Sequence, residues 1–492
     1  MVKTSHLSVE RIKRSYPKWK AISFSILAFS LIVAALVIIL PHRQAAVASS
    51  GGGVWPTYLE GTTHSGFNQT ETTITVSSAP NLKIHWRYHV GGNFSVKSIT
   101  TQPVEANGLI YWGSWDGNEH ATNLNGTQVW QKGLGYTFDA HCNNTVGVAS
   151  TATVQTMSIG GTSTPVLFVG GGNATFYALN ANTGATIWST SLGSSPSHFI
   201  YSSPTFYNGS IYIGLSSFGD CPLVQGQLVM LNATTGAIQH IFPVVPAGCL
   251  GGGVWGSPTI DSTDNSVYFA TGNGGSCSKG EPYTVALVKA SASDLSYISS
   301  WQVPASQQMS DSDFGSTPTL FNATIGGVQH LLVGVANKNG IYYTLDRSSI
   351  NSGPVWEATI AKIGGGCGPN CGDGSISPSG WDGSVLYVAG GQTTISGVSC
   401  KGSVRALDPA TGKFIWEHCL KDGPVLGAVS LVPGVAVVGE GPTLAVMATS
   451  DGHTLYTHKD TNNNSHFYGP ASISNGVLYI GNFDGYLYAF GT

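Results

Sequence analysis

The fold is decided by a stretch that begins SSPTFYNGSIYIG (residues 202–214) and, after a loop, continues QGQLVMLNATTGAIQHI (residues 225–241). Apolar side chains recur at every second position, as at Ile211 and Ile213, because successive side chains of a strand point to opposite faces. The Asn-Gly and Thr-Gly pairs between these segments supply the positive φ of tight turns. The stretch predicts a meander of about four antiparallel strands, a sheet that needs similar neighbours to bury both faces.

The same phrase recurs along the chain as S-P-T, a turn, x-Y-x-G, a loop, and A-L-(N/D)-x-x-T-G-x-x-x-W. The spacing of about 40 to 60 residues is typical of β-propeller blades. The ending is best preserved at Gly184 to Trp188 and at Gly412 to Trp416, and it predicts a Trp that docks between adjacent blades. The eight repeats start near Ile99, Ser150, Ser202, Gly256, Gly315, Ser375, Ala428 and Gly469.

The last repeat ends at Phe490, two residues before the end of the sequence, so it lacks an outer strand. Residues 82–90, which include Trp86, form a strand-like segment outside every repeat, and we expect them to complete this blade and close the ring. The prediction is therefore an all-β, eight-bladed β-propeller over residues 54–492. Seven blades remain an alternative, because the repeats after Ala428 are irregular.

Residues 21–40 contain no charged side chain, which predicts a single N-terminal transmembrane helix. Six Lys and Arg residues precede it, so we expect residues 1–20 to be a cytoplasmic basic tail and the propeller to be extracellular at the cell membrane. Residues 41–53 are then a small-residue linker. The alternative is a signal peptide cleaved after Ala-Val-Ala at 46–48, which would make the protein secreted.

The charge pattern argues against a nucleic-acid partner, because the formal net charge is −4 and the repeats contain no basic run. An even number of Cys, eight, in an exported chain predicts disulfides. Cys400 and Cys419 lie symmetrically about the turn at residues 408–412, so we expect them to face each other and bond. A second expected bond joins Cys221 to Cys249.

The repeat resembles that of the pyrroloquinoline quinone (PQQ) propellers, which include quinoprotein alcohol dehydrogenases and polyvinyl-alcohol dehydrogenases. The resemblance covers the chain from about Trp55, and Trp55-Pro56 with Gly66-Phe67-Asn68 is similar to the family's opening segment. Non-catalytic propellers of bacterial outer-membrane assembly share the repeat. The resemblance therefore implies the superfamily and leaves enzyme and binding protein open.

Three stretches resemble the family's cofactor site. The separation of Trp255 from Asn273, within a T-G-N sequence, implies a Trp that stacks under the quinone and an Asn that ligates Ca²⁺. Asp313, in D-S-D-F-G, matches the general base for an alcohol proton and a metal ligand. Lys338, in N-K-N-G-I-Y-Y-T-L-D-R, matches the cation that polarises a quinone oxygen. Structural roles, as a docking Trp and as turn residues, are the alternative for each.

Two departures separate the chain from the family's alcohol dehydrogenases. The chain contains no adjacent Cys pair, and His141 is the candidate to cover the cofactor in its place. The family's calcium Glu is also missing, and Asp220 is the nearest carboxylate. The resemblance thus implies PQQ and Ca²⁺ as cofactors, a small or polymeric hydroxyl substrate and an external electron acceptor. The alternative is a non-catalytic scaffold that binds proteins or glycans.

Overall fold

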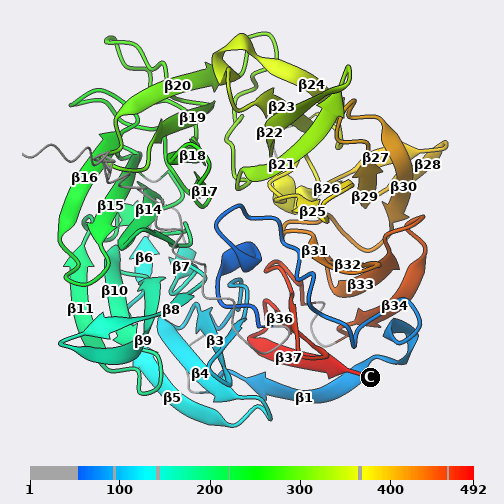
Figure 1. Ribbon diagram of the computed structural model, residues 1–492, viewed down its shortest axis with the longest axis horizontal. Coiled ribbons are helices and arrows are strands. Elements are labelled where there is room, and N and C mark those ends of the chain that lie inside the picture. Colours follow the sequence, from blue (N-terminus) through cyan, green and yellow to red (C-terminus); the bar gives the residue numbers. More distant parts are fainter. Residues whose placement is uncertain (1–53, 92–95, 140–143, 221, 364–367, 462–464) are drawn as a thin grey trace, which may run out of the picture. The chain divides into compact units, whose positions relative to one another are not determined.

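A computed structural model describes residues 54–91, 96–139, 144–220, 222–363, 368–461 and 465–492. Eight antiparallel sheets, seven of four strands and one of five, follow one another around a ring (Figure 1). Each sheet is a meander whose first strand lies nearest the centre, so the eight-bladed prediction is confirmed. The blade boundaries agree with the eight repeat starts read from the sequence.

The first four blades are built from consecutive strands, and blade 3 has the additional strand β12 (His198–Phe199), which pairs with β14. Their strands are β2 (Val104–Ala106), β3 (Leu109–Ser114), β4 (Asn118–Asn123) and β5 (Gln128–Gly133); β8 (Thr153–Ile159), β9 (Thr162–Gly170), β10 (Thr175–Asn180) and β11 (Thr186–Ser191); β13 (Thr205–Tyr207), β14 (Ser210–Ser217), β15 (Gln227–Asn232) and β16 (Ile238–Pro243); β17 (Thr259–Asp261), β18 (Ser266–Ala270), β19 (Ala286–Ser291) and β20 (Tyr297–Gln302).

Blades 5 to 8 continue the ring. Their strands are β21 (Thr319–Ile325), β22 (Val328–Ala336), β23 (Ile341–Asp346) and β24 (Pro354–Thr359); β25 (Gly380–Trp381), β26 (Leu386–Gly390), β29 (Gly402–Leu407) and β30 (Phe414–Leu420); β31 (Ser430–Val432), β32 (Val435–Glu440), β33 (Thr443–Ala448) and β34 (Thr454–Lys459); β35 (Ser472–Ser474), β36 (Val477–Gly481), β37 (Tyr486–Gly491) and β1 (Lys83–His89).

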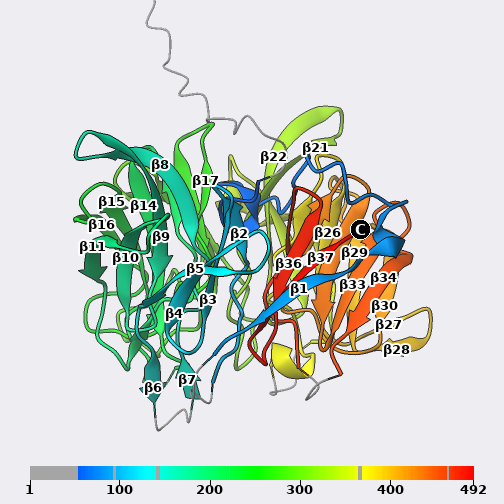
Figure 2. The same ribbon diagram turned by 90° about the horizontal axis from the view of Figure 1, so that it is seen from below.

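Short elements occupy the connections between strands. Two hairpins, β6–β7 and β27–β28, extend from the ring, and β6–β7 lies at the lower end in Figure 2 together with the short helix η4. These elements are β6 (Thr137–Asp139), β7 (Asn144–Val146), β27 (Thr393–Ile395), β28 (Val398–Cys400), η1 (Tyr58–Glu60), η2 (Ala79–Asn81), η3 (Ile350–Ser352) and η4 (Pro369–Cys371).

The ring is closed by β1, which pairs with β37 from Lys83↔Gly491 to His89↔Tyr486. The outer strand of the last blade therefore comes from the N-terminal side of the repeats, as the sequence predicts. β1 covers the outer edge of β37, which would otherwise be unpaired, and it joins the start and the end of the propeller in one sheet.

Tryptophans at the end of the outer strands dock on the next blade, as predicted. Trp188 Nε1 donates to the Ala233 carbonyl oxygen at 3.0 Å, and the indole lies against Gly236 in the following turn. Gly236 has φ of 72°, and a Cβ placed on it would lie 2.4 Å from Trp188. This turn thus requires glycine for both conformation and space. Equivalent indole hydrogen bonds are made by Trp86, Trp130, Trp356 and Trp416.

The repeated Ser-Pro-Thr explains how inner strands of neighbouring blades hold together. The Ser203 backbone N–H donates to Ser257 Oγ at 2.9 Å, and Thr205 Oγ1 donates to the Pro258 carbonyl oxygen at 2.6 Å. The same Thr bond joins Thr153 to Pro204 and Thr259 to Pro318. These side-chain hydroxyl groups bond to backbone groups that the strand ladders leave unpaired, and they join each inner strand to the next blade.

Residues 55–68 cross the centre of the ring, where Figure 1 shows them in dark blue. Their backbone carbonyl groups accept hydrogen bonds from inner strands of distant blades, including Thr62 from Ile260 (2.9 Å), Thr63 from Leu320 (3.1 Å), Ser65 from Trp381 (2.8 Å) and Gly66 from Leu431 (2.7 Å). One segment thereby ties blades together that are far apart in sequence. The sequence repeat contained no sign of this arrangement.

Two disulfides join described cysteines. Cys400 and Cys419 are bonded, as predicted, with a Cα–Cα distance of 5.3 Å, although Cys419 faces Ser403 in the ladder and Cys400 ends β28. The predicted Cys221–Cys249 bond is wrong, because Cys249 is bonded to Cys277. The Gly275 N–H donates to the Leu250 carbonyl oxygen at 3.0 Å, so the two loops already lie together.

The predicted tail, transmembrane helix and linker at residues 1–53 lie outside the described residues, as do His141 and Cys221. Within the part of the chain that the structure describes, no helix has the length and apolar character needed to span a bilayer.

Candidate functional site

A cavity of about 370 Å³ opens between the loops of blades 3, 4 and 5. Five of the predicted site residues line it, which are Asp220, Trp255, Asn273, Asp313 and Lys338. Each comes from a loop next to an inner strand or between the second and third strands of a blade. Trp255 and Asp313 precede β17 and β21, Asn273 follows β18, and Lys338 follows β22. The ring thereby brings residues together that are far apart in sequence.

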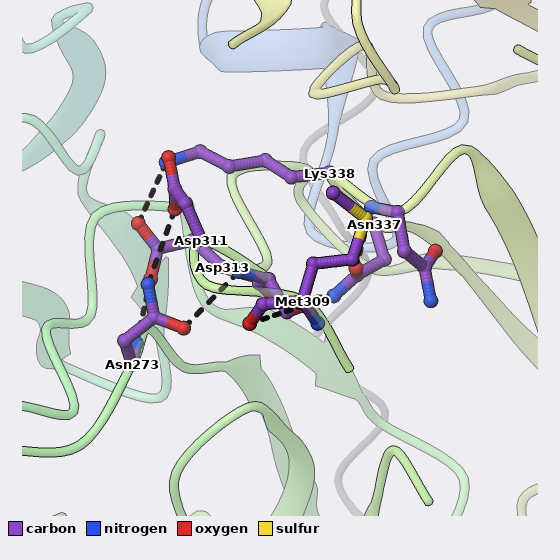
Figure 3. A network of polar contacts seen from close by, with 8 residues as sticks. Asn273, Met309, Asp311, Asp313, Asn337 and Lys338 are labelled. Carbon is purple, nitrogen blue, oxygen red and sulfur yellow. Dashed lines mark hydrogen bonds and ion pairs between the residues drawn. The ribbon is translucent and has the colours of Figure 1, made fainter. Parts of the chain in front are cut away.

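The centre of the site is an ion-pair network (Figure 3). Lys338 Nζ lies 2.7 Å from Asp313 Oδ2 and 2.9 Å from Asp311 Oδ1. The Lys338 and Asp313 side chains are only 15% and 11% exposed. Burial alone lowers the pKa of Lys338, but the charges and hydrogen bonds of Asp313 and Asp311 outweigh it and raise that pKa. Lys338 is therefore a charged group held inside the cavity wall.

Asn273 is fixed by both its backbone and its side chain. Its backbone N–H donates to Asp313 Oδ1 at 2.6 Å, and its side-chain Nδ2 donates to Asp311 Oδ1 at 3.1 Å. Its side-chain oxygen Oδ1 accepts from the Ser312 N–H at 3.1 Å. Asn337, which is fully buried, donates from Nδ2 to the Ser312 carbonyl oxygen at 2.7 Å. The segment that carries both aspartates is thus held rigidly from two sides.

Trp255 forms a flat wall of the cavity. Lys338 Nζ lies 5.2 Å from the ring centroid of Trp255, which is within cation–π range. Gly315 lies against the far edge of the indole, and a Cβ on Gly315 would be 2.1 Å from that ring. Glycine at position 315 therefore leaves the space that the indole occupies.

Asp220 faces the same cavity from blade 3. Burial is the main cause that raises its pKa, and the negative charges of Asp313 and Asp311 add to it, against the opposing charge of Lys338. Within the described residues, no group of three or more His, Cys, Asp and Glu side chains is arranged to hold a metal ion.

Sequence reasoning singled out Asp313 and left Asp311 without a role. The structure shows that Asp311 contacts both Lys338 and Asn273. Its place two residues before Asp313 was the available signal. Tyr201, Ser216 and Ser217 also line the cavity without having been predicted.

A ring of eight blades with this cavity at its loops defines a PQQ-binding-like propeller. The chain belongs to this family, since the family model described as outer membrane protein assembly factor BamB matches residues 120–278 and 344–491, more than half of the chain.

Similar proteins include two curated polyvinylalcohol dehydrogenases. The one from Pseudomonas sp. is 24% identical over 454 residues, covering 82% of this chain and 67% of that protein. The one from Sphingopyxis sp. (strain 113P3) is 24% identical over 432 residues, covering 75% and 62%. The chain thus spans about two thirds of the length of these relatives.

Among solved structures, the quinohemoprotein alcohol dehydrogenase from Comamonas testosteroni has a TM-score of 0.68 at 17% identity, covering 89% of this chain and 80% of that chain. At this identity the likeness shows the shared fold.

Proposed function

We propose that this chain is a quinoprotein-type dehydrogenase that oxidises an alcohol or another hydroxyl compound, including a polymeric one. The observation that carries the proposal is the convergence of Trp255, Asn273, Asp313 and Lys338 on one cavity. The relatives named polyvinylalcohol dehydrogenase support a hydroxyl substrate. Fold alone does not define a reaction, so the proposal rests on these side chains.

The volume and the lining of the cavity support a planar quinone as its ligand. Its volume of about 370 Å³ is within the range of small-molecule sites. The Trp255 indole offers a flat apolar face for a ring system, and Lys338 offers a positive charge for its oxygen atoms. PQQ, when bound, would supply the two-electron acceptor that no side chain of the protein provides.

The protein's own residues would handle the proton and the orientation of the substrate. Asp313 holds its Oδ1 on the Asn273 N–H and its Oδ2 on Lys338, so this carboxylate has a fixed direction. A substrate hydroxyl that reaches Asp313 can give its proton to it as a general base. Tyr201, Ser216 and Ser217 line the cavity and can hydrogen-bond to the substrate.

The alternative function is a non-catalytic propeller that binds a protein or a glycan. One observation favours it, namely that both carboxylate oxygens of Asp313 already accept hydrogen bonds within the protein, Oδ2 from Lys338 and Oδ1 from the Asn273 N–H. The family description as an assembly factor is in accord with a binding role.

We also propose that residues 21–40 anchor the chain in the cell membrane with the propeller outside, or that cleavage after residue 48 releases it. The uncharged run and the preceding basic residues support this location. Electrons would then leave to an external acceptor. Cell fractionation and N-terminal sequencing of the mature protein test the proposal.

The dehydrogenase proposal is tested with the full-length chain. The protein is mixed with PQQ, with and without Ca²⁺, and quinone uptake is followed by equilibrium dialysis and absorbance. We expect about one PQQ per chain and reduction of an electron-accepting dye when alcohols are added. Trp255→Ala should weaken uptake, whereas Trp416→Ala, on an outer strand, should leave it intact in the folded protein. Absence of uptake would refute the proposal.

A further inference from the structure

The oxygen atoms of the site converge on an ammonium group. Lys338 Nζ has three carboxylate oxygens within hydrogen-bond distance, Asp313 Oδ2 at 2.7 Å and Asp311 Oδ1 and Oδ2 at 2.9 and 3.1 Å. The Trp255 ring lies on a further side of the same nitrogen at 5.2 Å. This ammonium group therefore has a full set of favourable partners.

Two of the three residues expected to ligate Ca²⁺, Asn273 and Asp313, direct side-chain oxygens toward backbone donors. Asn273 Oδ1 accepts from the Ser312 N–H at 3.1 Å, and Asp313 Oδ1 accepts from the Asn273 N–H at 2.6 Å. Ca²⁺ takes six to eight oxygen ligands at about 2.3–2.6 Å. Each of these two oxygens is oriented by a backbone donor, and the other carboxylate oxygens of Asp311 and Asp313 bond to Lys338. Too few oxygens remain for the coordination sphere of Ca²⁺, so the arrangement does not fit the expected calcium site.

A divalent ion and the ammonium group also exclude each other by charge. A cation bound to Asp313 would lie a few ångströms from Lys338 Nζ, in a wall where the Lys338 side chain is only 15% exposed. Like charges repel strongly at such short range where water screens them poorly. Ca²⁺ would have to displace Lys338 from both aspartates before it could bind.

We propose that the ammonium group of Lys338 fills the cation position of this site, so that the protein binds its ligand without a divalent metal ion. The identity of the ligand rests on the proposed function, but the cation assignment does not. Asp311 then acts as a positioning residue, because it holds Lys338 next to both Asp313 and Trp255. The expected roles of Asn273, Asp313 and Asp220 as calcium ligands give way to this assignment.

The test uses full-length, chelator-treated protein and Ca²⁺ alone as the probe. Isothermal titration and thermal unfolding should show no saturable Ca²⁺ effect on the wild type up to about 10 mM, about tenfold above the weak end of calcium dissociation constants in proteins. Lys338→Met removes the ammonium and leaves the carboxylates, so this variant should bind Ca²⁺ at least about tenfold more tightly and unfold at a higher temperature when Ca²⁺ is present. Lys338→Gln provides a second variant in case the first does not fold.

Lys289→Met is the matched control. The Lys289 side chain is 9% exposed and lies 2.7 Å from Asp264 Oδ2, whose side chain is 43% exposed, so the substitution removes a similarly buried lysine from an ion pair outside the cavity. It should gain no Ca²⁺ binding, because among the described residues Lys289 Nζ bonds to one carboxylate oxygen, of Asp264, and to the Arg347 carbonyl oxygen, whereas Lys338 Nζ bonds to three carboxylate oxygens.

A spectroscopic readout complements the titration. Tb³⁺, which binds to calcium sites, should show Trp-sensitised luminescence in Lys338→Met and lose it in Lys338→Met/Asp313→Asn. Stoichiometric Ca²⁺ binding by the wild type that Asp313→Asn abolishes would overturn the proposal. So would folded Lys338→Met and Lys338→Gln variants that gain no Ca²⁺ affinity. Failure of PQQ uptake, in contrast, would refute the dehydrogenase and leave the cation assignment in place.

Discussion

Asp313 and Lys338 form a 2.7 Å ion pair at the open end of the antiparallel hairpin β21–β22. Asp313 precedes the first strand of blade 5, and Lys338 follows the second. The Lys338 backbone N–H also donates to the Asp313 carbonyl oxygen at 3.2 Å, so the two loops are joined by backbone and side chain alike. These two contacts orient both the expected general base, Asp313, and the cation, Lys338.

Removing the carboxylate should therefore affect stability and activity together. In Asp313→Ala, Lys338 loses one partner but keeps Asp311, so we expect the free energy of unfolding to fall by about 1–3 kcal/mol, less than for a fully unpaired buried charge. Dye-linked alcohol oxidation should be lost at saturating substrate. Urea unfolding and steady-state kinetics measure the two effects. Asp264→Ala, which breaks the Lys289 pair, should lower stability and leave turnover unchanged.

The docking tryptophans predict a difference between two glycines of one blade. Gly209 and Gly236 have φ of 76° and 72°, but a Cβ on Gly209 meets nothing within 4 Å, whereas on Gly236 it would meet Trp188 at 2.4 Å. Gly209→Ala should thus lower the free energy of unfolding by about 1–2 kcal/mol, from backbone strain alone. Gly236→Ala should lower it by about 1–3 kcal/mol more. Equal effects in chemical unfolding would contradict the docking role.

The blades were predictable because the signals for their strands and turns lie within each repeat. The Asn-Gly turn at residues 208–209 and the Gly236 turn are local, and the docking Trp recurs at a fixed distance after a turn glycine. Closure by β1 followed from counting strands, since one blade lacked an outer strand and one strand lacked a blade. The five converging site residues followed from their resemblance to a known family.

What the sequence did not indicate are contacts that no repeat encodes. Residues 55–68 bond to blades that lie hundreds of positions away, and nothing periodic marks their partners. The choice of Cys277 as the partner of Cys249 depends on how the loop after β18 folds back on Leu250. The position of Lys338 between two aspartates is likewise set by side-chain geometry, which spacing alone does not define.

Glu60 lies in the segment of residues 55–68 that crosses the centre of the ring, and it predicts a pH dependence of stability. Burial raises the pKa of Glu60 from 4.5 to about 7, so the folded protein holds this proton more tightly than the unfolded chain does. The contribution of Glu60 to stability is therefore fully present below pH 4.5, declines as the pH rises from 4.5 to about 7, and is lost above that.

Glu60→Gln removes this titration. The free energy of unfolding of the variant minus that of the wild type should rise by about 2–3 kcal/mol between pH 4.5 and 7 and then level off. Other buried carboxyl groups, such as Glu440, titrate equally in both proteins and cancel in the difference. Urea unfolding of both proteins between pH 4 and 8 measures it, and a difference that does not vary with pH would show that Glu60 is solvated in the folded state.

The two described disulfides should separate stability from ligand binding. They close loops of similar length, with sequence separations of 28 for Cys249–Cys277 and 19 for Cys400–Cys419. Cys277→Ser and Cys400→Ser should each lower the free energy of unfolding by about 2–4 kcal/mol.

Only Cys277 belongs to the loop that contains Asn273, whereas Cys400 lies on blade 6, away from the residues that line the cavity. Cys277→Ser should therefore also weaken PQQ uptake, measured by equilibrium dialysis, while Cys400→Ser leaves it unchanged. Equal uptake by both variants would mean that the Lys338 network holds Asn273 in place without help from the disulfide.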